Sequence, residues 1–414
     1  MSTTADHGLS HVIVMNRWQD RYADYAAYLD HTSCAVTYVT SPLGRGAVPA
    51  GAAEVVTLDD IEDPAQLRAA VLGLAERHGA PDLLITLKEE DLENAAALRV
   101  ELGLPGMRPE TAETFRDKVV MGERIAAAGL PIPAFAPLTG PADAHAFAAV
   151  HGWDLIVKPR SGSGSAGVLA VTGPEDLVLV DFDRTDLMVQ ARNPHPILHV
   201  DGVFDGTGLL VWRASRYVRT CLDFAHGSYY GSIEEADPEL HRVIGEYAEG
   251  FLRALTDEAT PFHLEVFLEE GPDGASCSFL EVGARVGGAE TPFLWREVHD
   301  WDLMEAAFHL QLGQPLRDGI DWDTQEVAGF IVIPAPAERP CRFTRATPMT
   351  GRTPGPYAEW VPEAGYVLPP AHGYEHVGGR FRFRGPDAAA VQRAVDATAR
   401  DYRVAADHVQ PAGV

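Results

Sequence analysis

The sequence predicts a mixed α and β fold, α/β in the first hundred residues and α+β beyond them. Up to residue 102, short apolar segments alternate with helix-like segments, which is typical of a parallel sheet with helices on both faces. From residue 109 the pattern changes to one long helix followed mainly by strands. A chain of 414 residues exceeds one core of ordinary size, so we expect two or three domains.

The N-terminal unit is predicted from apolar runs and from helical periodicity. The expected strands are 11–15 (HVIVM), 34–40 (CAVTYVT), 54–58 (EVVTL) and 82–87 (DLLITL), and the expected helices are 19–29, 65–77 and 92–102. Asn16-Arg17-Trp18 follows the first strand in place of G-x-G-x-x-G, which argues against a dinucleotide site. The loops at the carboxyl ends of such strands still commonly face a ligand.

The remaining elements are predicted in the same way. Residues 111–128 read as one long amphipathic helix, ended by Gly129 and Pro131. The expected strands are 154–159, 168–171, 187–190, 203 onward, 263–268, 278–282, 328–333 and 380–383, and a last helix is expected at 387–402.

Composition excludes several classes of protein. The 33 Lys and Arg against 60 Asp and Glu give a formal charge of −27, which repels the phosphates of nucleic acids. MSTTADHGLS lacks the basic flank and apolar core of a signal peptide, and no run of about 18 apolar residues predicts a membrane span. The four cysteines form no CxxC pair, so we expect no zinc site and reduced thiols in a cytoplasmic protein.

Lys158 ends an apolar strand, and the loop 160–167 (RSGSGSAG) follows at once. Its glycines allow backbone N–H groups to approach phosphate oxygens, and the lysine adds a mobile positive charge. In a Walker loop the lysine follows the glycines, so this order favours a flexible loop that covers phosphates from a strand hairpin. An exposed linker is the alternative.

Glu265 and Glu281 each lie within an apolar strand pattern, HLEVF and FLEV, and GPDG at 271–274 reads as a hairpin turn between them. Antiparallel neighbours would place both carboxylates on one face. Two buried like charges repel unless a cation lies between them, and Mg²⁺ prefers such ligands. Two solvated carboxylates on a polar face are the alternative.

Arg285 lies four residues beyond Glu281, and Gly287 and Gly288 follow it. A permanent planar cation suits a phosphate or a developing oxyanion, and the glycines free backbone amides for the same task. A salt bridge between Arg285 and Glu281 is the alternative. Lys118 stands near the start of the long helix, where surface solvation is the more frequent role.

In this order these features resemble the ATP-grasp superfamily of carboxylate–amine ligases. The ordered set is Asp117-Lys118 with the long helix, GLPIP at 129–133, Lys158-Pro159 with its loop, the segment 187–204, and Glu265 followed by Glu281-x-x-x-Arg285-x-Gly287-Gly288. Each motif alone is weak, but the order and spacing are specific, and the resemblance covers about residues 10 to 320.

The resemblance implies an ATP-grasp fold with a Rossmann-like N-terminal domain. It implies domains at 1–108, at 109–192 with the lid, at 193–320 with the catalytic core, and at 321–414 as an α+β extension packed on the core. It also implies ATP and Mg²⁺ as cofactors, small-molecule carboxylate and amine substrates, and a homodimer as an expected assembly.

The roles that the resemblance implies for single residues cover the whole cleft. Lys118 and Lys158 would contact ATP phosphates, Ser161, Gly162, Ser163, Gly164, Ser165 and Gly167 would form the lid, and Gln190, Ala191 and Arg192 would be the adenine hinge. His199 and Asp201 would contact ribose or phosphate, Glu265 and Glu281 would hold Mg²⁺, and Arg285, with Lys158 and Gly288, would be catalytic.

The sequence departs from the family pattern at two places. The hinge usually carries acidic residues and here reads Gln-Ala-Arg, and Gly283 stands where the metal motif usually has Asn. The loss of that Asn puts a second Mg²⁺ in doubt. A biotin-carboxylase-like enzyme that forms carboxyphosphate and a degenerate ATP-binding sensor or structural protein therefore stay open as alternatives.

Within the superfamily the chain is most similar to the L-amino-acid ligases, which implies amide or peptide bond formation through an acyl phosphate. Glu89 or Glu90 would then hold a substrate amine, with a solvated helix start as the alternative. Arg213, Ser228, Tyr229 and Tyr230 lie in the variable stretch where acceptor contacts usually fall.

Overall fold

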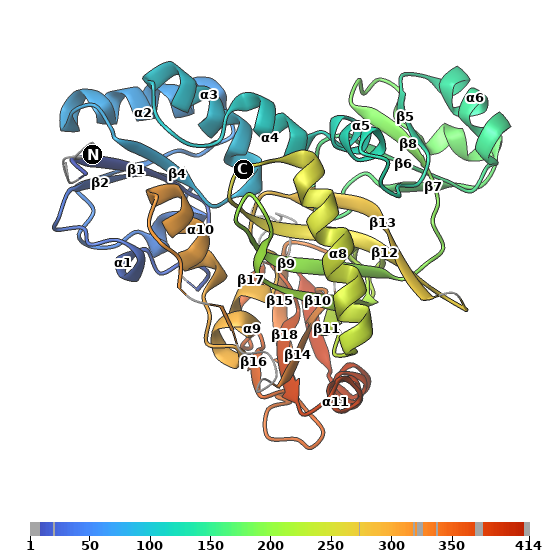
Figure 1. Ribbon diagram of the computed structural model, residues 1–414. Helices are drawn as coiled ribbons and strands as arrows, with labels where there is room; N and C mark the ends of the chain where they lie inside the picture. Colours follow the sequence, from blue (N-terminus) through green and yellow to red (C-terminus); the bar gives the residue numbers. More distant parts are fainter. Residues whose placement is uncertain are drawn as a thin grey trace.

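The computed structural model describes residues 9–19, 21–272, 274–317, 319–320, 326–336, 338–368 and 376–409. Four sheets organise this part of the chain (Figure 1). The N-terminal sheet lies at the upper left of Figure 1 and the lid sheet at its upper right, both beside the upper part of a large central sheet. The first eight residues and Asp273 of the expected hairpin turn lie outside the described residues.

The N-terminal unit is the parallel sheet that the alternation predicts, with strand order β3-β2-β1-β4. Its strands and main helices are β1 (His11–Asn16), β2 (Ala35–Thr40), β3 (Glu54–Thr57), β4 (Leu83–Thr86), α2 (Pro64–His78) and α3 (Leu92–Leu102). The helix expected at 19–29 is wrong, because α1 covers only Tyr25–Tyr28 and begins at its N-cap Asp24. The short helix leaves Trp18 and Tyr22 in the approach to the cleft.

The long helix expected at 111–128 is two helices, α4 (Pro109–Arg116) and α5 (Lys118–Ala127). The break is at Asp117, whose backbone is extended and whose carboxylate accepts hydrogen bonds from the first N–H groups of α5. Asp117 also forms an ion pair with Arg160, 2.7 Å between Oδ2 and Nη2, at the end of strand β6. The break therefore fixes Lys118 against the beginning of the glycine-rich loop.

The lid is a four-stranded antiparallel sheet of order β5-β8-β6-β7, covered by α6. Its elements are β5 (Phe135–Leu138), α6 (Pro141–His151), β6 (Leu155–Pro159), β7 (Leu169–Val171) and β8 (Leu187–Ala191). It has its own apolar core, formed mainly by Leu138, Phe147, Leu155, Val157 and Val189. A separately packed lid can move on the central sheet without disturbing the main core.

The central sheet has eight strands in the order β13-β12-β9-β10-β11-β14-β18-β16. These are β9 (Ile197–Phe204), β10 (Leu209–Arg219), β11 (Tyr230–Glu234), β12 (Thr260–Gly271), β13 (Gly274–Gly283), β14 (Val327–Ile333), β16 (Ala358–Trp360) and β18 (Gly379–Gly385). The strand expected from 203 onward is wrong, because Val203 and Phe204 end β9 and the next strand begins at Leu209. The hairpin is confirmed, with Gly271 opposite Gly274.

Helices complete the layers around this sheet. Helix α8 (Pro238–Leu255) lies along it (Figure 1) and buries Ile244, Phe251 and Leu252 in a core shared with β9, β12 and β13. The others are α7 (Cys221–Ala225), α9 (Thr291–Val298), α10 (Leu303–Leu312) and α11 (Ala388–Asp401). Strands β15 (Cys341–Ala346), β17 (Val367–Leu368) and β19 (Val404–His408) form the fourth sheet, which is small and three-stranded.

The C-terminal strands β14, β18 and β16 continue the central sheet across the predicted boundary at residue 320. The domain limits stay a prediction. Within the described residues, no helix is both long enough and apolar enough to span a membrane.

Candidate active site

The two glutamates predicted to hold a metal face each other across β12 and β13. Glu265 and Glu281 are direct partners in the antiparallel register, at a point where the pairing shifts by one residue. Direct partners in a sheet project to the same face. The Tyr217 hydroxyl donates a hydrogen bond of 2.5 Å to Glu265 Oε1. Burial raises the pKa of Glu265, but the neighbouring His263 and Tyr217 lower it by more, so that it lies below its usual value.

Two lysines lie beside this pair. Lys158, near the end of β6, is 5% exposed, and Lys118 Nζ lies 3.3 Å from Glu281 Oε2. Burial lowers the pKa of Lys158, and Glu281 acts in the opposite direction. Lys118 also donates a hydrogen bond of 3.0 Å to the Gly162 carbonyl. The glycine-rich loop is thus tied to the same cluster of charges as the glutamates.

A cavity of about 390 Å³ lies between the lid sheet and the central sheet. Apolar side chains line it from both sheets: Ile156, Val168 and Ala191 from the lid, and Ile197, Phe267 and Leu280 from the central sheet. Lys118, Lys158, Glu265 and Glu281 close the other end. The cavity offers a slot for a flat apolar ring and a charged end for phosphates.

A second, smaller cavity of about 140 Å³ continues from the charged end toward the N-terminal domain. The two cavities share Lys118, Tyr217, Glu265, Glu281 and parts of the loop. The second cavity adds an aromatic and polar lining formed by Trp18, Tyr22, Lys88, Glu89, Glu90, Tyr230, His263 and Arg285. It is therefore adjacent to the phosphate end and large enough for only a small organic group.

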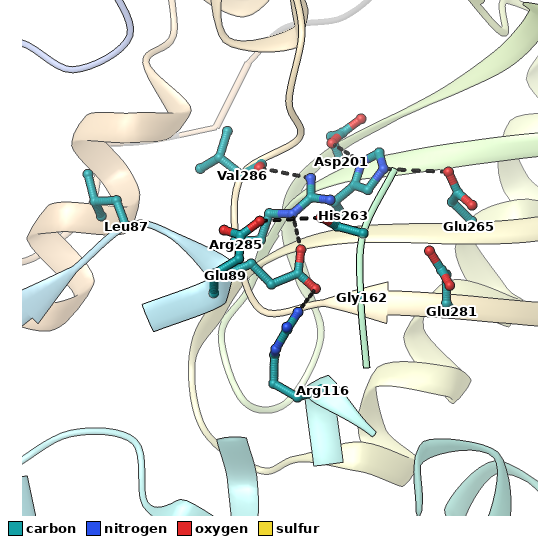
Figure 2. A network of polar contacts seen from close by, with 12 residues as sticks. Leu87, Glu89, Arg116, Gly162, Asp201, His263, Glu265, Glu281, Arg285 and Val286 are labelled. Carbon is teal, nitrogen blue, oxygen red and sulfur yellow. Dashed lines mark hydrogen bonds and ion pairs between the residues drawn. The ribbon is translucent and has the colours of Figure 1, made fainter. Parts of the chain in front are cut away.

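Arg285 is held by Glu89, which follows β4 of the N-terminal unit (Figure 2). The Arg285 Nε donates to Glu89 Oε2 at 2.8 Å, and Arg116 Nη1 donates to Glu89 Oε1 at 2.9 Å. Although burial raises it, the two arginines lower the pKa of Glu89 to about 2. Both carboxylate oxygens of Glu89 are thus bonded to arginines, and Glu89 orients Arg285; the amine-binding role stays a prediction.

Glu90 is in a different environment. Its Oε1 accepts a hydrogen bond of 3.3 Å from the Ser163 hydroxyl, and its Oε2 is buried without a hydrogen-bond partner among the described residues. A buried carboxylate oxygen without a donor is costly, which favours a donor supplied by a ligand.

Gly283, the residue that departs from the family pattern, makes room for Glu89. A Cβ atom built on Gly283 would lie 3.2 Å from Glu89 Oε1 and 3.3 Å from Arg285 Cγ. A longer side chain such as Asn would crowd the carboxylate that holds Arg285. The departure and the Glu89–Arg285 pair therefore belong together.

A buried cluster of His199, Asp201 and His263 lies beside Glu265; Asp201 is its central member, and His263 is the member that the sequence did not reveal. Asp201 accepts hydrogen bonds from His199 Nδ1 at 2.6 Å and from His263 Nδ1 at 2.8 Å. Although burial lowers it, Asp201 raises the pKa of His263 to about 9. His263 and Glu265 are two positions apart on one strand, so the alternation of side chains could have identified His263.

The structure brings most of the predicted site residues together around the two cavities. Those that line them are Lys118, Lys158, Gly162, Ser163, Gly164, Ser165, Gln190, Ala191, Arg192, Glu265, Glu281, Arg285, Gly288, Glu89, Glu90 and Tyr230. Those that line neither are Ser161, Gly167, His199, Asp201, Arg213, Ser228 and Tyr229. His199 and Asp201 instead bond to each other, and Tyr229 packs in the C-terminal core.

The hinge lines the cavity, but its backbone donors are already used. The Ala191 N–H donates to the Ala134 carbonyl at 2.8 Å, and the Arg192 N–H donates to the Asp154 carbonyl at 2.9 Å. Contacts with an adenine ring would therefore use the hinge carbonyls or the N–H of Asn193, which also lines the cavity.

This arrangement, in which a lid sheet and a central sheet enclose a cleft beside a parallel-sheet domain, is the ATP-grasp fold, as the resemblance predicted. The L-amino acid ligase of Bacillus licheniformis matches with a TM-score of 0.72 and 17% identity, over 97% of this chain and 100% of that one. The N5-carboxyaminoimidazole ribonucleotide synthetase of Thermotoga maritima matches with a TM-score of 0.66 and 15% identity, over 95% and 99%.

Curated relatives agree with the fold. An L-arginine-specific L-amino acid ligase of Bacillus subtilis is 27% identical over 271 residues, 62% of this chain and 64% of the relative. A phosphoribosylamine–glycine ligase of Streptomyces coelicolor is 27% identical over 256 residues, 58% and 60% of the two chains. The chain spans less than two thirds of the length of the curated relatives it matches. No family model matches it.

Proposed function

We propose that the protein is an ATP-dependent carboxylate–amine ligase that uses an amino acid as a substrate. The observation that carries the proposal is the opposed pair Glu265 and Glu281, set between two lysines at the junction of the two cavities. The names of the relatives, two of which are amino-acid ligases, support the same class.

The residues at this junction fit Mg²⁺. Two carboxylates on one face repel each other unless a cation lies between them, and hard oxygen donors open to a cavity are the ligands that Mg²⁺ accepts. Glu265 and Glu281 would hold the ion, which when bound would neutralise charge on the phosphate oxygens. Gly283 offers no third side-chain ligand, and Glu89 beside it is occupied by two arginines.

The proposed reaction has two steps. A carboxylate oxygen of the first substrate attacks the γ-phosphorus of ATP, ADP leaves, and Lys118 and Lys158 bind the phosphate charge. The nitrogen of the amine, in its neutral form, then attacks the acyl carbon; the amide bond forms, the acyl–phosphate bond breaks, and phosphate leaves with the proton that the nitrogen loses. Arg285, fixed by Glu89, is placed to stabilise the oxyanion of the tetrahedral intermediate. No side-chain nucleophile is needed.

The loop between β6 and β7 would exclude water from the acyl phosphate. Ser163 at its tip contacts Glu90 of the N-terminal domain, and Gly162 contacts Lys118. Closure over the junction would seal the second cavity from solvent, which protects a hydrolysable intermediate.

The lining of the second cavity supports an organic amino substrate over bicarbonate. Trp18, Tyr22 and Tyr230 provide apolar contact area, and the unpaired oxygen of Glu90 would accept hydrogen bonds from an ammonium group. A requirement for bicarbonate instead of an amino acid would favour the carboxyphosphate-forming alternative. ATP binding without ADP release across a broad amino-acid panel would favour a sensor.

Arg285→Ala tests the proposal. We expect amine-dependent ADP release to fall about 10²–10³-fold, since the variant removes the donor at the oxyanion. The matched control is Arg253→Ala, an exposed arginine on α8 that forms a surface ion pair. ADP release would be screened against pairs of amino acids, with the product identified by mass spectrometry and the fold checked by circular dichroism. Retained turnover in a folded Arg285→Ala protein would refute the proposal.

A further inference from the structure

A third cavity, of about 330 Å³, lies on the other side of the segment that carries Arg285. It is enclosed by β4 and α3 of the N-terminal domain, the loop 105–107, the start of β12, and α10. Most of its lining is apolar, with Leu83, Leu87, Leu92, Met107, Leu310 and Leu312 among the aliphatic residues, and the acidic Glu258 also lines it. The proposed ligase reaction makes no use of this cavity.

Arg99 lines the cavity and is 2% exposed. Its Nε and Nη2 donate to the Leu84 carbonyl at 3.0 and 2.8 Å, and Nη2 also donates to Gln311 Oε1 at 2.9 Å. All of these acceptors are neutral. Among the described residues, none accepts a hydrogen bond from Nη1 or forms an ion pair with Arg99.

The other buried arginines differ from Arg99 in this respect. Arg116 pairs with Glu89 at 2.9 Å, and Arg380 pairs with Glu290 at 3.0 Å. A buried cation with no ion-pair partner is costly, and burial lowers the pKa of Arg99 to about 10; Arg108 acts in the same direction and Glu258 in the opposite one. At neutral pH the group is still charged, so the cavity offers a fixed positive charge at one end of an aliphatic space.

We propose that this cavity is a binding site for a small aliphatic monocarboxylate, separate from the catalytic cleft. The carboxylate would accept hydrogen bonds from the Arg99 guanidinium, and the aliphatic chain would lie against the leucines. The volume suits a molecule of about the size of an amino acid side chain with its acid group. The ligand would also touch Ala284, Arg285 and Val286, which line the cavity.

Gly106 indicates that the space around the guanidinium is shaped for this purpose. Its φ of +110° is a conformation that favours glycine, and a Cβ atom there would lie 3.1 Å from Arg99 Nε. The loop therefore covers one face of the guanidinium with backbone alone.

The test is calorimetric titration of the full chain with 4-methylpentanoate, in a buffer without carboxylates and without ATP. The neutral 4-methylpentanamide is the matched ligand control. We expect the acid to bind wild type and the amide to bind at least about tenfold more weakly, because it lacks the charge that Arg99 pairs with. Absence of binding by the acid would overturn the proposal.

Three variants locate the site. Arg99→Met removes the charge, Leu310→Trp fills the cavity and leaves Arg99 intact, and Lys118→Ala alters the catalytic cleft alone. We expect at least tenfold weaker binding in the first two and no change in the third. If Arg99→Met does not fold, Leu310→Trp decides. Binding that survives Leu310→Trp, or that is lost in Lys118→Ala, would overturn the proposal, whatever the outcome for ligase activity.

Discussion

Two groups of charged side chains in this molecule, one around Glu290 and one around Glu265 and Glu281, differ in how their carboxylates are paired. Glu290 is fully buried and bonded by three arginines, Arg21 and Arg380 at 3.0 Å and Arg382 at 2.8 Å. Glu265 and Glu281 face each other, and within the described residues no arginine forms an ion pair with either. A carboxylate whose oxygens are bonded to arginines links parts of the chain. A carboxylate without arginine partners is available to a ligand.

The positions of the clusters agree with this difference. The Glu290 cluster ties the N-terminal segment at Arg21 to the C-terminal strand β18, which carries Arg380 and Arg382. The Glu265–Glu281 pair instead lines both cavities of the cleft. The first cluster should therefore determine stability, and the second should determine activity.

Glu281→Gln tests the second half of this comparison and has the largest expected effect. Removing one charge weakens the site for a divalent cation, so ADP release should fall at least about 10²-fold. Stability should change by less than about 1 kcal/mol, because Glu281 is partly exposed. The control is Glu270→Gln on the same hairpin, whose surface pairing with Arg216 lies outside the cleft. Equal losses in both variants would break the comparison.

Glu290→Gln tests the first half. The variant removes the carboxylate to which three arginines bond, of which Arg380 is buried, and we expect a loss of about 3–5 kcal/mol in the free energy of unfolding. Urea denaturation measures the loss, with Glu123→Gln on the exposed face of α5 as the control. Nucleotide binding per folded molecule should be unchanged. A stable Glu290→Gln protein would show that the arginines do not depend on this carboxylate.

The elements that the sequence predicts well are those with a local signal. The four N-terminal strands are apolar runs, and the β12–β13 hairpin combines two such runs with a turn, so the sequence alone places Glu265 and Glu281 opposite each other. The break at Asp117 escapes prediction because the apolar periodicity continues through it. The Asp117 carboxylate also accepts a hydrogen bond from an arginine 43 residues away, Arg160, a contact that no local pattern predicts.

The parts of the site that the sequence does not reveal are contacts between distant segments. Glu89 and Arg285 are 196 residues apart, and nothing local to either predicts that they meet. The sequence therefore offers Glu89 and Glu90 alike for the amine-binding role. Trp18 and Tyr22 give no sign of their position, because an aromatic residue that faces a cleft has the same sequence pattern as one that packs in a core.

Glu89 combines both kinds of environment, since two arginines bond it and it also lines the cleft. Glu89→Gln should lower kcat about tenfold through misplacement of Arg285, with the binding of ADP unchanged. The stability that the Glu89 carboxylate contributes should also depend on pH. The folded-state pKa of about 2 lies below the ordinary 4.5, so the carboxylate stabilises the fold above pH 4.5 and loses this effect as the pH falls toward 2.

The stability difference between wild type and Glu89→Gln should accordingly be constant from pH 7 to 5 and should shrink below pH 4.5. Urea denaturation at stepped pH values measures it, and Glu123→Gln on the exposed face of α5 is the control. A difference that grows on acidification would contradict the assignment of the charge to Glu89.

Gly283→Ala has the smallest expected effect and probes the same contact sterically. The added Cβ atom would stand 3.2 Å from Glu89 Oε1 and 3.3 Å from Arg285 Cγ, so the carboxylate must shift by a few tenths of an ångström. Such crowding costs about 1–3 kcal/mol where neighbours cannot move, and the partly open cleft should keep the fall in kcat below tenfold. In Gly250→Ala, the control on α8, the new atom would meet only Leu130 Cδ2 at an ordinary 3.6 Å. The substitution Gly283→Ala would be made both in wild type and in Glu89→Gln. If it lowers kcat in wild type but not in Glu89→Gln, the two residues act as one unit. An equal fall in both proteins would show that they act independently.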